Sequence, residues 1–203
     1  MQRSKTMNLR EIVVIASISV VFGVLYLAWI IFGQFIKGIF GPIAHGAISG
    51  VWIMAPVLCA YIIRKPGVAL LAEMIAAGTE VLVGSVNAGV ILIVGFTQGL
   101  GAELTFALFL YRSYRLPVLM LAGMFGMVAN YLTFFFIHGY SEFAYGVRVL
   151  MVGAMLISGA TIAGWGSKKI ADALSRTGVL NNFALGRINQ KKRMEENAIS
   201  HDG

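Results

Sequence analysis

Long apolar segments separated by short polar connections dominate the chain. The apolar segments cover residues 12–32, 42–63, 68–86, 88–111, 117–137 and 149–167. An α-helix rises ~1.5 Å per residue, so about 20 residues cross the ~30 Å hydrocarbon layer of a bilayer. The pattern therefore predicts an all-α integral membrane protein, built as a six-transmembrane-helix bundle.

The polar connections between these segments are short. They cover residues 34–41, 64–67, 112–115 and 138–148, and two of them are tight basic turns. The pattern divides the chain into a cytoplasmic N-terminus (1–11), a six-helix membrane domain (12–167) and a basic cytoplasmic tail (168–203). A cleaved signal peptide is a poor interpretation of the first segment, because its apolar run is too long and no small-residue cleavage site follows.

Basic residues lie almost entirely on one side of the predicted bundle. An even number of spans puts both termini on the same side. That side then carries fourteen of the 16 Lys and Arg residues, and only Lys37 and Arg148 lie opposite. The positive-inside rule makes the basic side cytoplasmic.

Composition supports a partnership with the lipid bilayer and argues against nucleic acid. The chain is 58% hydrophobic and only 12% charged, whereas soluble domains carry about 25% charged residues. The net charge of +7 comes from residues that flank apolar spans rather than share one face, which is not the footprint of a nucleic-acid-binding surface.

Three carboxylates fall inside apolar segments. A charge at bilayer depth costs at least ~2.5–3.5 kcal/mol, so such residues usually face a bundle interior, a cavity or a partner. One helical face of the third segment carries Glu73, Ala77, Glu80, Gly84 and Asn87, and the fourth segment carries a row of Gly95, Gly99 and Glu103 with Gln98 nearby. Two small and polar faces on consecutive spans predict the walls of a site.

Other polar and aromatic residues fall at similar depth, mostly in the outer half. The candidate ligand-binding residues are Glu80, Glu103, Gln98, Asn130, Trp52, His45, Tyr26 and Asn87. This mixture suits a flat, aromatic, cationic ligand. The alternative interpretation is ordinary membrane architecture: an interfacial aromatic belt, an interfacial histidine, a packed tryptophan, and glutamates that hydrogen-bond neighbouring helices.

Catalytic signatures are absent from the sequence. There is no Walker A motif, no His-Glu-x-x-His, no Gly-x-Ser-x-Gly and no Cys/His cluster, so we expect no enzyme, no cofactor and no bound metal. Two functions remain: a binding subunit without its own energy source, or a stand-alone proton- or cation-coupled carrier using Glu73, Glu80 and Glu103 as a relay. About 200 residues without an inverted repeat is small for the second.

Three stretches carry a resemblance to a known family. They are LREIVVIASISVVFGVLY (Leu9 to Tyr26), GTE (Gly78 to Glu80) and GLGAELTFALFLYR (Gly99 to Arg112). The chain resembles the YkoE-type thiamine/hydroxymethylpyrimidine permeases, which are substrate-binding S components of energy-coupling factor (ECF) transporters. The resemblance implies a multi-pass protein of the bacterial cell membrane that binds thiamine or a related pyrimidine. It also implies a transmembrane coupling (T) subunit and ATPase subunits as partners.

The same resemblance suggests a docking surface for the coupling subunit. In many S components the first helix docks through an Ala-x-x-x-Ala face. The comparable positions here read Ala16-x-x-x-Val20, with Ser19-x-x-x-Gly23 beside them. Because small residues allow close helix approach, we expect docking through Ala16, Ser19 and Gly23.

Overall fold

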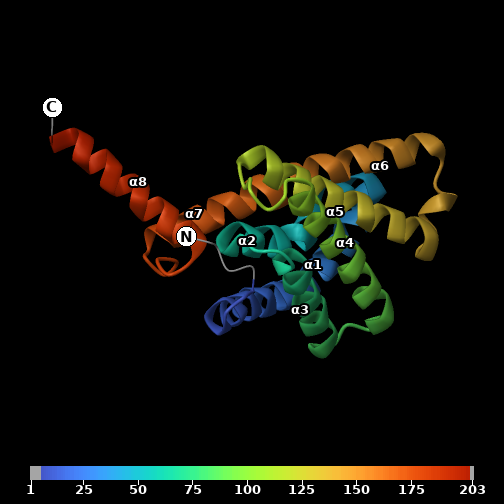
Figure 1. Cartoon of the computed structure of the whole chain (residues 1–203). Helices are drawn as coiled ribbons and strands as arrows, with labels where there is room; N and C mark the ends of the chain where they lie inside the picture. The colour runs from blue at the N-terminus through green and yellow to red at the C-terminus, as the bar shows by residue number, and fades with distance from the viewer. Residues whose placement is uncertain (1–5, 202–203) are drawn as a thin grey trace.

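The computed structural model describes residues 6–201, in which every regular element is a helix. Figure 1 shows the helices gathered into a bundle, with the last of them projecting away from it. In chain order the elements are α1 (Leu9–Ile48), η1 (Ser49–Ile53), α2 (Met54–Ile63), α3 (Val68–Leu82), α4 (Ala88–Leu108), α5 (Leu116–Ile137), η2 (Tyr140–Glu142), α6 (Tyr145–Ser158), the π-helix η3 (Gly159–Gly166), α7 (Ser167–Arg176) and α8 (Ala184–His201).

Long apolar helices confirm the all-α membrane class. Four helical segments of the described chain are long and apolar enough to cross a bilayer: 9–63, 88–108, 116–137 and 145–176. The first of these joins two of the apolar runs that the sequence separated, and the third predicted run corresponds to α3, which is only 15 residues long.

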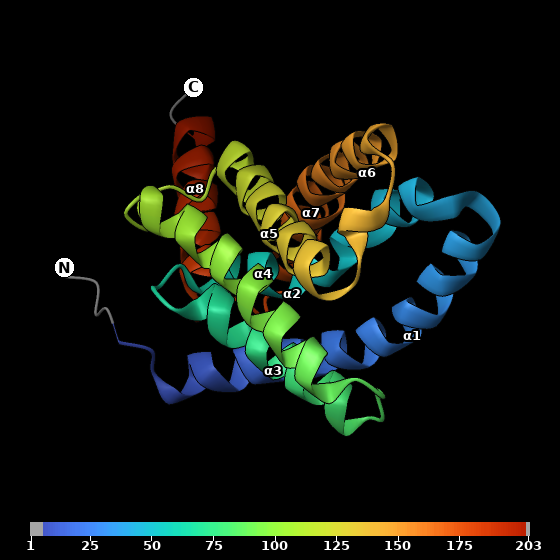
Figure 2. The same ribbon diagram turned by 90° about the vertical axis from the view of Figure 1, so that its right-hand side faces the viewer.

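The predicted loop over residues 34–41 is wrong, because α1 continues through it as helix. The break falls at its end, where Gly41 has φ 81° and is followed by Pro42. Proline disfavours helical geometry in the residue before it, and glycine reaches positive φ without strain. Figure 2 shows the consequence, with α1 running along one side of the bundle before the chain turns back toward α2.

The last apolar segment is also longer than predicted. Helices α6, η3 and α7 follow one another without a gap from Tyr145 to Arg176. The predicted boundary between membrane domain and tail, at residue 168, therefore falls inside a continuous helical run.

Glycines allow the helices of the bundle to cross closely. A Cβ on Gly123 of α5 would lie 2.0 Å from the Gly159 carbonyl oxygen of η3. Where α4 crosses α3, a Cβ on Gly95 would lie 2.6 Å from the Ala77 Cβ, and one on Gly99 would lie 2.8 Å from the Glu73 Cβ. The small face predicted on the fourth segment is thus a helix-packing surface, as is common in membranes.

Part of the predicted docking surface is buried within the chain, where α1 crosses its neighbours. Ser19 is fully buried, and a Cβ on Gly23 would lie 2.5 Å from the Ala76 carbonyl oxygen and 2.6 Å from the Thr79 Cβ. The structure therefore gives no support to docking through Ser19 and Gly23, because Ser19 is buried within the chain and Gly23 packs on α3. Ala16 remains partly exposed.

The same substitution, glycine to alanine, should have opposite effects on stability at two positions of α1. Gly23→Ala should destabilise the protein by ~1–3 kcal/mol, because the added methyl forces α1 and α3 apart. Gly38→Ala should be neutral or stabilise by up to ~1 kcal/mol, because a Cβ there meets no atom within 4 Å and alanine is the better helix former. Thermal unfolding in detergent measures both. Equal shifts in the two variants would contradict the close crossing.

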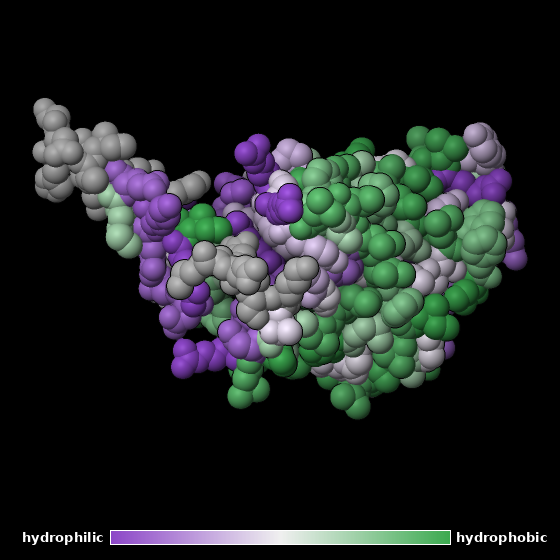
Figure 3. Space-filling model, viewed as in Figure 1, coloured by the Kyte–Doolittle hydropathy of each residue, from purple (hydrophilic) through white to green (hydrophobic). Residues whose placement is uncertain are grey.

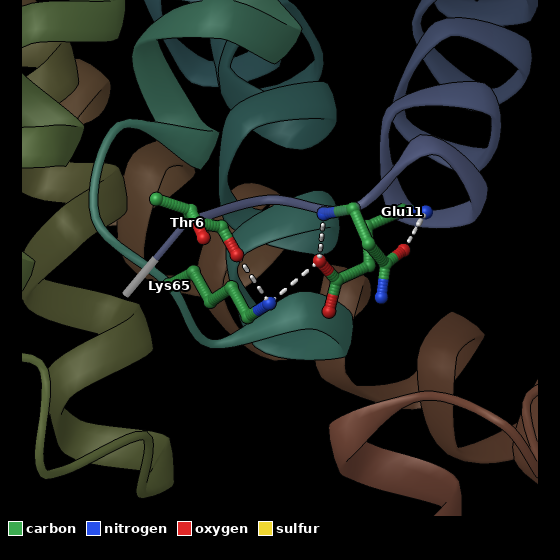
Figure 4. Close-up of polar contacts among 4 residues, drawn as sticks. Thr6, Glu11 and Lys65 are labelled. Carbon is green, nitrogen blue, oxygen red and sulfur yellow. Dashed lines mark hydrogen bonds and ion pairs between the residues drawn. The ribbon is translucent and has the colours of Figure 1, made fainter. Parts of the chain in front are cut away.

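A polar latch fixes the start of α1 (Figure 4). Lys65 Nζ, in the α2–α3 connection, donates to Glu11 Oε2 at 2.7 Å and to the Thr6 carbonyl oxygen at 2.8 Å. The Asn8 side chain accepts from the Glu11 N–H, and the Glu11 carboxylate accepts from the Asn8 N–H, which completes a capping box. The latch ties the beginning of α1 to the turn between α2 and α3.

Candidate ligand cavity

A cavity of about 250 Å³ lies near the α3–α4 and α5–α6 connections. Its size is at the small end of the ~300–1,000 Å³ typical of small-molecule sites. The structure brings six of the eight predicted ligand-binding residues to its wall: Glu80, Gln98, Asn130, Trp52, His45 and Asn87. Tyr26 and Glu103 do not line it.

Buried polar side chains form a directional network along one wall. Gln98 Nε2 donates to Glu73 Oε1 and to the Trp52 carbonyl oxygen at 3.2 Å. Asn130 Nδ2 donates to Gln98 Oε1 at 2.8 Å. A carboxylate can only accept, so Glu73 fixes which end of the Gln98 amide faces it. Gln98 in turn orients Asn130, whose remaining amide oxygen is left as an acceptor at the cavity wall.

Tyr26 supports this network from behind. It is almost completely buried, and its hydroxyl donates to Glu73 Oε2 at 3.4 Å while accepting from the Ala55 N–H at 3.2 Å. Tyr26 therefore positions Glu73 and does not line the cavity, so the geometry gives no support to the prediction of a ligand-binding Tyr26. The bond also links α1 to the cavity wall on α3.

Glu80 differs from Glu73 in having an unused oxygen. Its side chain is 4% exposed, lines the cavity, and has no hydrogen-bond partner for Oε1 among the described residues. Burying a polar or charged group without a partner is costly. A ligand that offers a hydrogen-bond donor or a positive charge would satisfy this oxygen.

Aromatic rings come to the cavity from two sides. The rings of His45 and Trp52 lie 5.6 Å apart, and Gly33 leaves room for them, since a Cβ there would lie 3.1 Å from His45 Nε2. From the α5 end, Phe134 and Tyr140 stack at 5.3 Å. Burial raises the pKa of Tyr140 to about 12, so its phenol stays protonated at neutral pH. Rings on both sides favour a flat ligand between them.

Glu103 has a structural role and does not line the cavity. Its carboxylate accepts from the backbone N–H groups of Gly67 at 2.6 Å, Ala69 at 2.9 Å and Leu70 at 3.3 Å, and from the Tyr111 hydroxyl at 2.9 Å. It caps the N-terminus of α3, where backbone donors lack helical partners. This geometry gives no support to the predicted ligand role of Glu103, or to its place in the three-glutamate relay of the carrier hypothesis.

The sequence interpretation left several cavity residues out of the candidate set. Glu73 was treated as a helix–helix hydrogen-bonding group, which it is, but it also lines the cavity. Ser49, Phe134, His138 and Tyr140 line it as well. His138 and Tyr140 belong to the polar, aromatic connection 138–148, whose composition was the available signal. Nothing in the sequence pattern distinguished Ser49 or Phe134 from packing residues.

Comparison with known proteins finds a relative and a solved structure that match nearly the whole chain, and a family model that matches part of it. A family model described as "ABC-type cobalt transport system, permease component" matches residues 10–129. The Bacillus subtilis (strain 168) protein named "Putative HMP/thiamine permease protein YkoE" is 45% identical over 189 residues, covering 93% of this chain and 95% of that protein. A solved structure titled "Crystal structure of an S-component of ECF transporter" superposes with a TM-score of 0.92 at 44% identity, covering 97% of this chain and 98% of that one.

An apolar helical bundle enclosing one polar and aromatic cavity defines a membrane subunit that binds a small substrate. The chain belongs to the YkoE-type family of ECF-transporter S components. It is a multi-pass membrane transport subunit and not an enzyme.

Proposed function

We propose that the cavity captures thiamine or its hydroxymethylpyrimidine precursor from outside the cell. The observation that carries this proposal is the unpartnered Oε1 of buried Glu80 at the cavity wall. Thiamine has a permanent thiazolium cation, and a cation moved out of water needs a counter-charge. The Bacillus subtilis relative is named a putative permease for this pair of compounds.

The other groups of the cavity match the rest of such a ligand. The free amide oxygen of Asn130 can accept from an aminopyrimidine, and the His45–Trp52 pair offers a ring surface. Rings beside a cation add ~0.5–2 kcal/mol of attraction. A volume of about 250 Å³ holds a compact, two-ring molecule more readily than a larger cofactor.

We propose further that the chain crosses the membrane six times with both termini in the cytoplasm. The break at Gly41 within the first long helix supports two crossings there, and α3 supplies another apolar segment. The distribution of basic residues supports the orientation. In this orientation the cavity, bounded by the α3–α4 and α5–α6 connections, opens to the outside.

Uptake then depends on a T subunit and on ATPase subunits, as expected of an S component. We place the docking surface on the exposed side of α1, next to the face that packs on α3. Ala16 is partly exposed there, and Val20 and Val24 are 44% and 48% exposed. This keeps the Ala16-x-x-x-Val20 part of the expected surface and drops Ser19 and Gly23.

Adjacent positions on α1 test this placement. A cysteine at Val20→Cys should cross-link to the T subunit in membranes, whereas one at Ser19→Cys should not, because position 19 is buried within the chain. Native Cys59 is buried and gives the background. Cross-linking from position 19 but not 20 would place the partner on the side now assigned to α3.

Calorimetry on the purified chain tests the ligand. Thiamine and hydroxymethylpyrimidine should bind with one site per chain, and choline, a cation without a pyrimidine, should not. Equal binding of choline would mean that charge alone is recognised, and no binding of either pyrimidine would contradict the proposed function.

A further inference from the structure

A second concave surface lies where α2 ends and α7 and α8 begin, and it shares no residue with the ligand cavity. Its volume is about 960 Å³, and its walls come from the end of α2, the α4–α5 connection, α7 and α8. We call it the cationic groove, because its lining includes Arg64, Arg112, Arg115, Lys168 and Arg176. Figure 3 shows hydrophilic residues gathered over this part of the molecule, against the apolar surface of the bundle.

Three arginines of the groove, Arg112, Arg115 and Arg176, have no ion-pair partner among the described side chains. Asp172 is the carboxylate of its lining, and it already pairs with Lys168 and accepts from the Tyr61 hydroxyl at 3.0 Å. Among the side chains that the structure describes, which are those of residues 6–191, 194 and 195, no carboxylate lies within ion-pair distance of Arg112, Arg115 or Arg176. All three arginines are exposed.

Two separate elements bring these arginines to one groove. Lys168, Asp172 and Arg176 follow one face of α7 at four-residue intervals. Arg112 and Arg115 project from the α4–α5 connection, which Tyr111 anchors by its hydrogen bond to Glu103. The arginines therefore line the same concave surface from different walls. Cations that only interact with solvent would usually be spread over a convex surface.

Exposed apolar residues adjoin the groove along the chain on both sides. Leu108 and Leu110, just before Arg112, are 71% and 67% exposed. Trp165, just before α7, is 50% exposed, and Lys169 Nζ lies 5.3 Å from the centre of its ring. Tryptophan and lysine in this arrangement are typical of the membrane–water interface.

We propose that the cationic groove binds the phosphate groups of an anionic phospholipid. The guanidinium groups of Arg115 and Arg176 hold the phosphate oxygens from opposite walls, since arginine matches phosphate geometry with paired hydrogen bonds. The acyl chains lie along the exposed apolar residues beside the groove. Given the proposed orientation, the lipid comes from the cytoplasmic leaflet, where basic pockets between helices bind such headgroups. The apolar flanks favour a lipid over a soluble phosphate compound.

Native mass spectrometry of the full chain in detergent tests the proposal. The protein is titrated with cardiolipin and with phosphatidylcholine. Arg115→Gln/Arg176→Gln removes one arginine from each wall, and Arg187→Gln/Lys191→Gln removes two charges from α8 outside the groove. The groove pair should lower cardiolipin affinity about tenfold or more, while the α8 pair leaves it unchanged. All four side chains are exposed, so neither pair of substitutions removes a buried contact. Thiamine affinity should therefore be unchanged in both double variants.

Four outcomes would overturn the proposal. Equal losses in the two variant pairs would show a general effect of net charge, and equal binding of phosphatidylcholine would show no recognition of an anionic headgroup. Displacement of cardiolipin by millimolar inorganic pyrophosphate would identify a site for soluble phosphates. Loss of the co-purifying T subunit with unchanged lipid binding would identify a protein-docking surface.

Discussion

Glu80→Gln should weaken thiamine binding on the order of several hundred-fold, because removing one partner of a buried charge pair typically costs ~3–5 kcal/mol. The substitution keeps the size and shape of the side chain and removes only its charge. The neutral hydroxymethylpyrimidine should lose much less affinity, since it brings no cation into the cavity. Calorimetry with both ligands on both proteins measures the difference.

Glu142→Gln is the matched control for this experiment. Glu142 is an exposed carboxylate in the α5–α6 connection and does not line the cavity, so both affinities should stay as in the wild type. Equal losses of the two ligands in Glu80→Gln would show that Glu80 recognises the aminopyrimidine by hydrogen bonding and not the thiazolium by charge. No loss of either would place the counter-charge elsewhere, and Glu73 would be the next candidate because it lines the cavity and Glu103 does not.

Glu103→Leu should give the largest loss of stability, about 3 kcal/mol or more. The substitution leaves the N–H groups of Gly67, Ala69 and Leu70 without their acceptor, and each unsatisfied buried donor costs ~1–3 kcal/mol. It also releases Tyr111, which anchors the α4–α5 connection. The midpoint of thermal unfolding in detergent measures the effect.

Glu103→Gln separates the structural role from a ligand role. Glutamine keeps one acceptor oxygen, so its loss of stability should be clearly smaller than that of the leucine variant. Thiamine affinity of the folded glutamine variant should equal that of the wild type, since Glu103 does not line the cavity. A loss of affinity comparable with that of Glu80→Gln, at unchanged stability, would return Glu103 to the ligand site.

The features that depend on composition and helical period were predictable from the sequence. The apolar segments predicted an all-helical membrane protein, and the shared face of Glu73, Ala77 and Glu80 predicted a wall of the cavity. The signal is strong in these cases because a polar group in an apolar span must face the bundle interior, a cavity or a partner. For the same reason Gln98 and Asn130, which also line the cavity, could be picked out from the sequence, and their contact with a ligand stays a prediction.

Features that depend on a neighbour's position were not predictable. The carboxylate of Glu103 resembles that of Glu80 in sequence, but it falls beside the start of α3, which only the fold determines. Gly23 is suited to packing against any helix, and periodicity could not tell α3 from a partner subunit. Pro42 indicated a break in the helix near Gly41, but the polar residues before Gly41 were equally compatible with a loop.

Uptake by reconstituted protein tests the central claim most directly. The chain is placed alone in proteoliposomes under an imposed proton or sodium gradient, and accumulation of labelled thiamine is followed over time. An S component without an energy source should bind thiamine with one site per chain and accumulate none, until its T and ATPase subunits are added with ATP. Gradient-driven accumulation by the chain alone would contradict this account.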